Sequence, residues 1–265
     1  MTLIYGFLLS SVIAYLAWRA RSLTRSGAWM AVIIGGLVFG LGGIAWAALL
    51  LAFFISSSVL SRFLAARKAA LDEKYAKGSQ RDWGQVLANG GLGAALALAY
   101  GIFPWESWLW FAYIGAMAAV TADTWATEIG VFSPALPRMI TSGKPVERGT
   151  SGGVTLLGYG AVLFGGVFIG VVAVLFGAPV SLNIVFTAAA AGLIGSTVDS
   201  LLGASLQAIY YCPACEKETE RHPRHSCGSD TFQRRGWAWL NNDVVNFACS
   251  LAGAGAALLV GYLFL

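Results

Sequence analysis

The chain has 265 residues, of which 57% are hydrophobic and only 11% are charged, and its mean hydropathy is +0.70. This composition excludes an ordinary soluble domain, an intrinsically disordered chain, a collagen and a small disulfide-stapled secreted module. A polytopic membrane protein is the class that fits. The net charge of +4 then reflects orientation in the membrane and contact with anionic lipid, so the expected partner is the lipid bilayer and no nucleic acid is expected.

Apolar segments long enough to cross a hydrocarbon core of about 30 Å, which takes roughly 20 residues, recur along the chain. The stretch from Ala28 to Leu60 is too long for one helix, and its centre, Gly40–Gly43, is typical of a tight turn, so we divide it there. The expected spans are Leu3–Trp18, Ala28–Phe39, Ile44–Leu60, Gln85–Phe103, Ser107–Ala122, Gly152–Gly177, Asn183–Leu206 and Trp239–Tyr262. The predicted fold class is all-α: a polytopic membrane helical bundle of about eight transmembrane helices, with residues 1–265 as one integral membrane domain.

Lys and Arg residues follow every second span, which is the pattern of cytoplasmic loops. Together the four groups hold all 17 Lys and Arg residues of the chain: Arg19, Arg21 and Arg25; Arg62, Arg67, Lys68, Lys74, Lys77 and Arg81; Arg138, Lys144 and Arg148; and Lys217, Arg221, Arg224, Arg234 and Arg235. Glu106 is the only acidic residue expected outside. The pattern predicts a bacterial inner-membrane protein with both termini outside, and the start Met1-Thr2 lacks the basic region of a cleaved signal peptide.

Carboxylates gather at the cytoplasmic level of three spans. Asp123 and Glu128 lie where the fifth span exits, Asp199 lies in the inner part of the seventh, and Asp243 lies where the eighth begins. Ionisable groups at membrane depth are costly unless they are paired, hydrated or bound to metal, so this layer predicts a functional site. Helix capping and interhelical packing are the alternative roles. The amides at the same level are Asn89, Asn241, Asn242 and Asn246.

Divalent-metal and phosphate chemistry suits such a layer, because Mg²⁺ is held by a few carboxylates and takes phosphate oxygens among its remaining ligands. Asp123 and Glu128 are five residues apart, so on a continuous helix they diverge by about 140°. They meet at one ion only if the helix ends or breaks between them.

A glycine-rich loop, Lys144–Gly153, leads into the sixth span. The N-terminus of that span is expected to face the cytoplasm with free N–H groups, beside flexible glycines, two hydroxyls, Lys144 and Arg148. These features predict a phosphate cradle, although the loop is not a Walker A motif. An ordinary interhelical turn is the alternative.

Four potential soft ligands lie in a loop over residues 207–237, between the seventh and eighth spans. Cys212 and Cys215 form a Cys-x-x-Cys pair, and Cys227 follows two histidines, of which we favour His225 over His222. The set suits tetrahedral Zn²⁺ in a structural site. Free or redox-active thiols are the alternative, and a disulfide is not expected in a cytoplasmic loop.

The order of these motifs resembles an integral-membrane family that includes plant phytyl-phosphate kinase, animal transmembrane protein 19 and many uncharacterised bacterial members. The matching elements cover most of the chain, and they are Gln85–Gly90, Asp123–Gly130, Pro137–Thr141, Gly149–Gly153, Asp199–Ala204 and Asn241–Asn246. The resemblance implies transfer of a phosphoryl group from a nucleoside triphosphate, with CTP as the expected donor, to an isoprenyl monophosphate such as a phytyl- or geranylgeranyl-like phosphate. The Cys/His loop occurs in part of the family, which implies that it braces or tunes the site.

The resemblance and the polar layer together give each candidate residue a role. Asp123, Glu128, Asp199 and Asp243 are assigned to Mg²⁺ or its bound water, and Asn89, Asn242 and Asn246 to phosphate or metal oxygens. The expected phosphate ligands are Arg138, Lys144, Arg148, Gly149, Thr150, Ser151, Gly152 and Gly153. A cytidylyltransferase that forms a CDP-lipid would use similar residues, and a membrane transporter is the alternative from another class.

Overall fold

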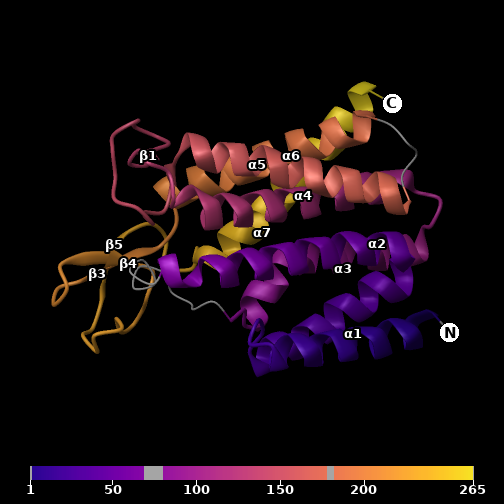
Figure 1. Ribbon diagram of the computed structural model, residues 1–265, viewed down its shortest axis with the longest axis horizontal. Helices are drawn as coiled ribbons and strands as arrows, with labels where there is room; N and C mark the ends of the chain where they lie inside the picture. The colour runs from indigo at the N-terminus through magenta and orange to yellow at the C-terminus, as the bar shows by residue number, and fades with distance from the viewer. Residues whose placement is uncertain (1, 69–79, 178–181, 265) are drawn as a thin grey trace.

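The computed structural model describes residues 2–68, 80–177 and 182–264. Lys74 and Lys77 of the second basic group lie outside these residues. Seven helices and five short strands are described: α1 (Thr2–Arg19), α2 (Arg25–Lys68), α3 (Trp83–Ile102), α4 (Ser107–Gly130), β1 (Arg138–Met139), β2 (Gly153–Val154), α5 (Leu156–Phe176), α6 (Leu182–Ser205), β3 (Ile209–Cys212), β4 (Lys217–Thr219), β5 (Phe232–Arg235) and α7 (Asn242–Phe264). The helices form one elongated bundle, and the strands lie at one end of it (Figure 1).

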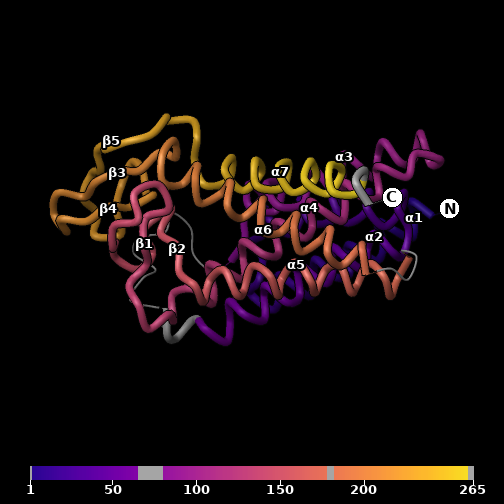
Figure 2. Tube along the Cα trace, turned by 90° about the horizontal axis from the view of Figure 1, so that it is seen from above, coloured from indigo at the N-terminus to yellow at the C-terminus, as the bar shows by residue number. Residues whose placement is uncertain are grey.

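The predicted bundle of membrane helices is confirmed. Six described helices are long and apolar enough to cross a membrane. The apolar segment of α2, Arg25–Leu64, is 40 residues long. α2 breaks at Gly43, whose φ of 77° and ψ of −162° are not helical, so its two arms fold back on each other where a turn was predicted. Counting both arms of α2 and the central helix α4 gives about eight spans. Both termini lie at the end opposite the strands, as an even number of crossings requires (Figures 1 and 2).

α4 is the centre of the bundle. Every residue from Ala112 to Ala122 is buried, and α4 contacts α2, α3, α5, α6 and α7. A helix that is buried on all sides must be small or apolar all round, and this stretch is rich in alanine. Gly115 faces the backbone of Gly253 on α7, an approach that leaves no room for a β-carbon. Close contact between small residues therefore sets the helix spacing, as is usual for membrane helices.

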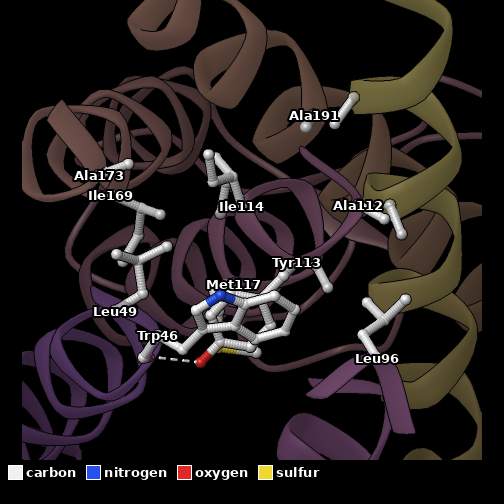
Figure 3. Close-up of a cluster of buried hydrophobic side chains, with 14 of the residues drawn as sticks. Trp46, Leu49, Leu96, Ala112, Tyr113, Ile114, Met117, Ile169, Ala173 and Ala191 are labelled. Atoms are coloured by element: carbon white, nitrogen blue, oxygen red, sulfur yellow. Dashed lines mark hydrogen bonds between the residues drawn. The ribbon is translucent and has the colours of Figure 1, made fainter. Parts of the chain in front are cut away.

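An aromatic cluster anchors α4 to the second arm of α2. The rings of Trp46 and Tyr113 stack with their centroids 4.3 Å apart, and the Tyr113 hydroxyl donates a hydrogen bond of 2.8 Å to the Trp46 carbonyl oxygen. Leu49, Ile114, Met117 and other apolar side chains surround the pair (Figure 3). The buried phenol is thus satisfied, and the core fixes the depth of α4 in the bundle.

Two boundaries differ from the expected spans. α4 continues to Gly130, well past Ala122, because the polar residues after Ala122 face a cavity between helices and do not leave the bundle. α5 begins at Leu156 and not at Gly152, because Gly153 and Val154 form strand β2, which pairs with β1. The glycine loop is therefore held as part of a hairpin, and helix α5 starts beyond it.

The Cys/His segment folds as a small antiparallel sheet, where a loop was expected. Its strand order is β4-β3-β5, with Tyr210 opposite Thr219 on β4 and opposite Gln233 on β5. The Gln207–Trp237 bridge and the hydrogen bond from the Trp237 N–H to the Leu206 carbonyl, 2.9 Å long, tie the base of the sheet to the end of α6. We call the segment from Gln207 to Trp237 the Cys/His module; it lies beside the β1–β2 hairpin at the same end of the bundle (Figure 2).

Candidate functional site

A polar cavity of about 620 Å³ lies where the helical bundle meets the β1–β2 hairpin and the Cys/His module. Helices α2 to α7, the glycine loop and the module all contribute to its walls. Its predicted site residues are Asn89, Asp123, Glu128, Gly149, Thr150, Ser151, Gly152, Gly153, Asp199, Asn242, Asp243 and Asn246. Residues more than a hundred positions apart in the chain thus converge, which helix capping alone would not require.

Two carboxylates in the cavity are close neighbours. Asp123 on α4 accepts a hydrogen bond of 3.1 Å from the Ser196 hydroxyl on α6, and Asp199 lies three residues further along α6, on the same face as Ser196. The negative charges of Asp123 and Asp199 repel each other. Within the described residues the buried Oδ2 atom of Asp199 has no hydrogen-bond partner. A pair of buried carboxylates with a free oxygen requires a proton or a cation for compensation.

Glu128 faces a different part of the cavity. Helix α4 is unbroken between Asp123 and Glu128, so the condition for both to reach one ion is not met. Glu128 instead accepts a hydrogen bond of 2.8 Å from the Ser61 hydroxyl, and its charge interacts favourably with that of Arg81. The continuous helix thus turns Glu128 toward α2 and Arg81, away from Asp123.

The glycine loop forms part of the cavity wall. Gly149 and Gly152 have φ values of 76° and 82°, a left-handed conformation that favours glycine. The Gly158 N–H donates to the Thr155 side chain at 2.9 Å, so Thr155 caps α5. The predicted cradle of free N–H groups at this helix start is therefore incomplete, since the protein itself satisfies one of them.

Hydrogen bonds connect the glycine loop to the Cys/His module. The Ser151 hydroxyl donates to the Gln207 Oε1 atom at 2.7 Å, and the Gln207 amide donates to Glu220 at 2.8 Å. Gln207 is only 1% exposed. One buried amide thus fixes the position of both walls relative to each other.

The three basic residues assigned to phosphate do not line the cavity. Arg148 donates to the carbonyl oxygen of Val131 at 2.7 Å, and Arg138 donates to that of Gly143 at 2.9 Å. Lys144 is exposed on the β1–β2 hairpin. Arg138 thus stabilises the hairpin backbone, and Arg148 connects the hairpin to the segment that follows α4.

Several lining residues were not singled out from the sequence. They come from the segment around the start of α3 and from the module, and they include Arg81, Gln85, Tyr210 and Glu220; His222, considered above only as a zinc ligand, also lines the cavity. Arg81 was recognised only as one member of a basic loop. Its proximity to the cavity depends on how α2 and α3 pack, which no local pattern reveals. Gln85 is the first residue of one of the recognised motifs, so the sequence could have identified it.

The Cys/His module brings four ligand atoms together. Side chains of Cys212, Cys215, His225 and Cys227 offer one atom each, all within 4.8 Å of one another. The Cys212 and Cys227 sulfurs are 3.6 Å apart, and the His225 Nδ1 atom is 3.4 Å from the Cys227 sulfur. This group could hold a metal ion such as zinc, and the preference for His225 over His222 agrees with it. His222 stacks on Tyr210 instead, with centroids 4.3 Å apart.

The two thiols of the Cys-x-x-Cys pair have opposite pKa shifts: a hydrogen bond with Cys227 and burial raise the pKa of Cys215 to about 11. Burial raises the pKa of Cys212, but hydrogen bonds from the Cys215 and Ala214 backbone and from Cys227 outweigh it, so the pKa lies below its usual value. A lowered pKa favours the thiolate, which is the form that binds metal.

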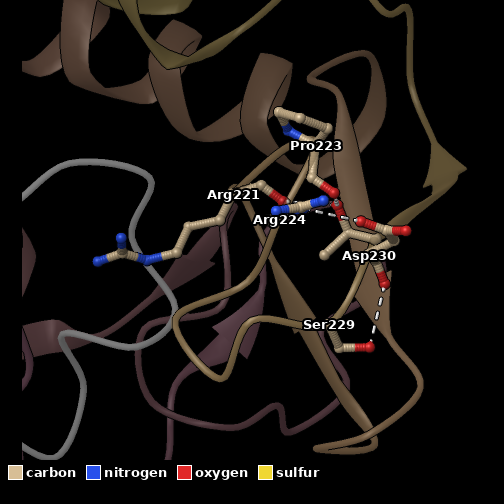
Figure 4. A network of polar contacts seen from close by, with 6 residues as sticks. Arg221, Pro223, Arg224, Ser229 and Asp230 are labelled. Carbon is tan, nitrogen blue, oxygen red and sulfur yellow. Dashed lines mark hydrogen bonds and ion pairs between the residues drawn. The ribbon is translucent and has the colours of Figure 1, made fainter.

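The turn that carries His225 and Cys227 is closed on itself. Arg224 and Asp230 form an ion pair of 3.2 Å at its base, and the Thr231 hydroxyl donates to the Arg221 carbonyl oxygen at 3.0 Å (Figure 4). These contacts close the turn that carries the second half of the ligand set.

Comparison with known proteins supports the resemblance drawn from the motifs. Residues 8–254 match the family described as integral membrane protein DUF92. Protein PGR of Arabidopsis thaliana is 34% identical over 94% of this chain and 92% of its own length. An uncharacterized membrane protein of Methanocaldococcus jannaschii is 31% identical over 97% of this chain and 94% of its own. No solved structure matches the chain.

Proposed function

We propose that this chain, which belongs to the integral membrane protein family DUF92, is a prenyl-phosphate kinase. The proposed reaction transfers the γ-phosphoryl group of a nucleoside triphosphate, with CTP as the expected donor, to an isoprenyl monophosphate. An oxygen of the acceptor phosphate forms a bond to the γ-phosphorus, the bond from that phosphorus to the bridging oxygen breaks, and a nucleoside diphosphate leaves with an isoprenyl diphosphate as the second product.

The observation that carries this proposal is the polar cavity with its paired carboxylates. Asp123 and Asp199 come from two helices and face the same space, with a buried Asp199 oxygen free, and Asp243 lines the same cavity. Oxygen donors of this kind suit Mg²⁺, so these three residues would hold it. When bound, the ion would supply charge neutralisation at the phosphates.

The other cavity residues have roles that require no metal. The glycine loop lines the cavity; its Thr150 and Gly153 N–H groups donate within the loop, and the N–H groups of Gly149, Ser151 and Gly152 would orient the donor phosphates. Asn89 of α3 and Asn242 and Asn246 of α7 line the cavity and would donate hydrogen bonds to phosphate oxygens. The acceptor is already an anion, so no strong general base is required, and phosphoryl transfer depends mainly on alignment and charge.

The membrane setting supports a lipid acceptor. The residues that line the cavity include the glycine loop and the Cys/His module, which lie at the strand end of the bundle (Figure 1). A prenyl phosphate has an anionic head that would lie at this end and a tail that would lie in lipid. The proposed orientation places this end in the cytoplasm and Glu106 outside. Maleimide labelling of Cys residues introduced at 106 and 148 should come from opposite sides, and labelling of both from one side would overturn the orientation.

Product analysis tests the proposed activity. Purified protein in lipid nanodiscs is mixed with Mg²⁺, each nucleoside triphosphate in turn, and geranyl, farnesyl, geranylgeranyl or phytyl monophosphate. Mass spectrometry should detect a prenyl diphosphate and a nucleoside diphosphate in equal amounts. Pyrophosphate and a nucleotide-linked prenol would instead identify a cytidylyltransferase, while the absence of either product from folded protein would reopen the transporter alternative.

A further inference from the structure

A second, apolar cavity lies next to the polar one. It measures about 90 Å³ and lies between α1, the two arms of α2 and the start of α3. Its walls include Ile13 and Ala17 of α1, Ile34 and Leu50 of α2, and Val86 of α3. We call it the apolar crevice.

The two cavities share three polar residues. Arg81, Gln85 and Asn89 line both the apolar crevice and the polar cavity. Gln85 and Asn89 lie one turn apart on one face of α3, and Arg81 lies two residues before the helix begins at Trp83; we call these three residues the polar stripe. Among the described lining residues of the crevice, the polar stripe and Ser10 are the only polar ones. The polar stripe also lines the polar cavity, in which the carboxylates lie.

Arg81 is the cation at this junction. Its Nη1 atom donates to the Ser58 hydroxyl at 2.9 Å, and its guanidinium carbon lies 5.8 Å from the ring centroids of both Phe53 and Phe54. Both rings line the crevice. Arg81 therefore touches the apolar walls with one side of its guanidinium group, and it is the one Lys or Arg lining the polar cavity in the described part of the chain.

We infer that the apolar crevice binds the isoprenoid tail of the acceptor next to its phosphate, with Arg81, Gln85 and Asn89 holding the phosphate at the junction. This inference rests on the proposed function. An anionic head beside a branched apolar tail matches a cation beside an aliphatic and aromatic crevice, and arginine is suited to phosphate through its planar set of donors. The small crevice volume, against about 620 Å³ for the polar cavity, limits recognition to the part of the tail nearest the phosphate.

The position of α1 supports this assignment. α1 packs against α2 through small residues, with Gly6 next to the Gly40 backbone, while Tyr5, Leu8 and Leu16 remain exposed on its other side. The crevice beneath α1 thus lies at the lipid-facing edge of the bundle. The remainder of a longer tail can continue into the bilayer, so tail length beyond the crevice should have little effect on binding.

Photolabelling tests the inference without requiring turnover. The probe is farnesyl monophosphate with a diazirine in the isoprene unit nearest the phosphate, presented in nanodiscs of phosphatidylcholine. Labelled peptides should map to the crevice faces of α1, α2 and α3. The matched prenol without phosphate should label these peptides much less, and added phosphatidic acid should not displace the probe, which separates a prenyl phosphate from a general anionic lipid.

Two adjacent alanines of α2 provide a matched pair of variants. Ala47 lines the apolar crevice, whereas Ala48, equally half-buried, lines neither cavity. Ala47→Phe should reduce labelling by about tenfold, since filling an apolar pocket removes contacts of that order, and Ala48→Phe should leave it unchanged. Where turnover is measurable, Ala47→Phe should raise KM for the prenyl phosphate and not KM for the nucleotide.

The outcomes separate this inference from the proposed function. Labelling of α5 or α6 in place of the crevice, or equal loss in both Phe variants, would overturn the tail site even if kinase activity is found. If Ala47→Phe lowers labelling of the crevice but the protein has no kinase activity, the tail site would be supported and the proposed reaction would be excluded.

Discussion

The polar cavity has two walls that are built in different ways. The helical wall carries Asp123 on α4. Five neighbouring helices pack around α4, and its residues Ala112–Ala122 are buried. The module wall carries Tyr210 on the four-residue strand β3, and Glu220 and His222 in the segment that follows the three-residue strand β4. Packing positions the first wall, whereas the second depends on the Cys/His ligand set and on hydrogen bonds to the glycine loop. Substitutions on the helical wall should therefore remove activity without unfolding the protein. On the module wall, activity and local structure should be lost together.

The carboxylates of the helical wall should give the largest effect. Asp123→Asn and Asp199→Asn keep the side-chain volume and one hydrogen-bonding oxygen but remove the charge, and an amide is a poor ligand for a hydrated divalent ion. Turnover should fall by at least about a hundredfold, while thermal unfolding in detergent stays near that of the wild-type chain because core packing is unchanged. Near-normal turnover in both variants would contradict the metal assignment.

Metal removal should damage the module wall and spare the bundle. Cys215→Ser takes one ligand from the Cys3His group, so we expect loss of about one zinc ion per chain and a fall in activity of about ten- to a hundredfold. Metal analysis and hydrogen exchange over residues 207–237 are the measurements, and protection of the helices should persist.

Cys249 supplies the control for that experiment. It is buried in α7 and is not part of the ligand group, so Cys249→Ala should retain the zinc and the module's protection. Since thiolates bind zinc, the wild-type module should also lose the ion as pH falls and the cysteines protonate. A stable, active chain without metal would show that the strands hold the wall by themselves.

Gln207 tests the connection between the walls. Gln207→Leu removes both the bond from Ser151 and the bond to Glu220, and the buried groups left behind cost about 1–3 kcal/mol of stability. KM for the nucleotide should rise because the glycine loop loses its fixed position. Gln233→Leu, on the exposed strand β5, is the control and should change neither property; equal effects in both variants would exclude a specific link.

Sequence patterns predicted the helical wall better than the module wall, for physical reasons. Uncharged apolar runs define spans directly, and Gly40–Gly43 marked the break in α2 that Gly43 provides. Asp123 and Asp199 stood out because charge is costly at membrane depth. The strands of the module are too short for a period-two pattern to be recognised, and Arg81 reaches the cavity only through the packing of α2 against α3. The assignment of Arg148 to phosphate followed its sequence neighbours, whereas its side chain donates to carbonyl oxygens of the segment between α4 and β1.

Arg148 should give the smallest effect, and it distinguishes a bracing role from a phosphate contact. Its guanidinium group donates to Val131 at 2.7 Å and to Pro134 at 3.4 Å, so Arg148→Ala should loosen the hairpin and raise KM for the nucleotide by about fivefold, equivalent to the loss of roughly 1 kcal/mol from a hydrogen bond. Arg148→Lys retains the positive charge but lacks the planar pair of donors that reaches two carbonyl oxygens. If bracing is the role, Arg148→Lys should resemble Arg148→Ala, and Lys144→Ala on the exposed part of the hairpin should match the wild type. Restoration of KM by Arg148→Lys, together with a rise in KM for Lys144→Ala that diminishes at high salt, would instead assign both charges to phosphate and require the hairpin to close over the cavity when nucleotide binds.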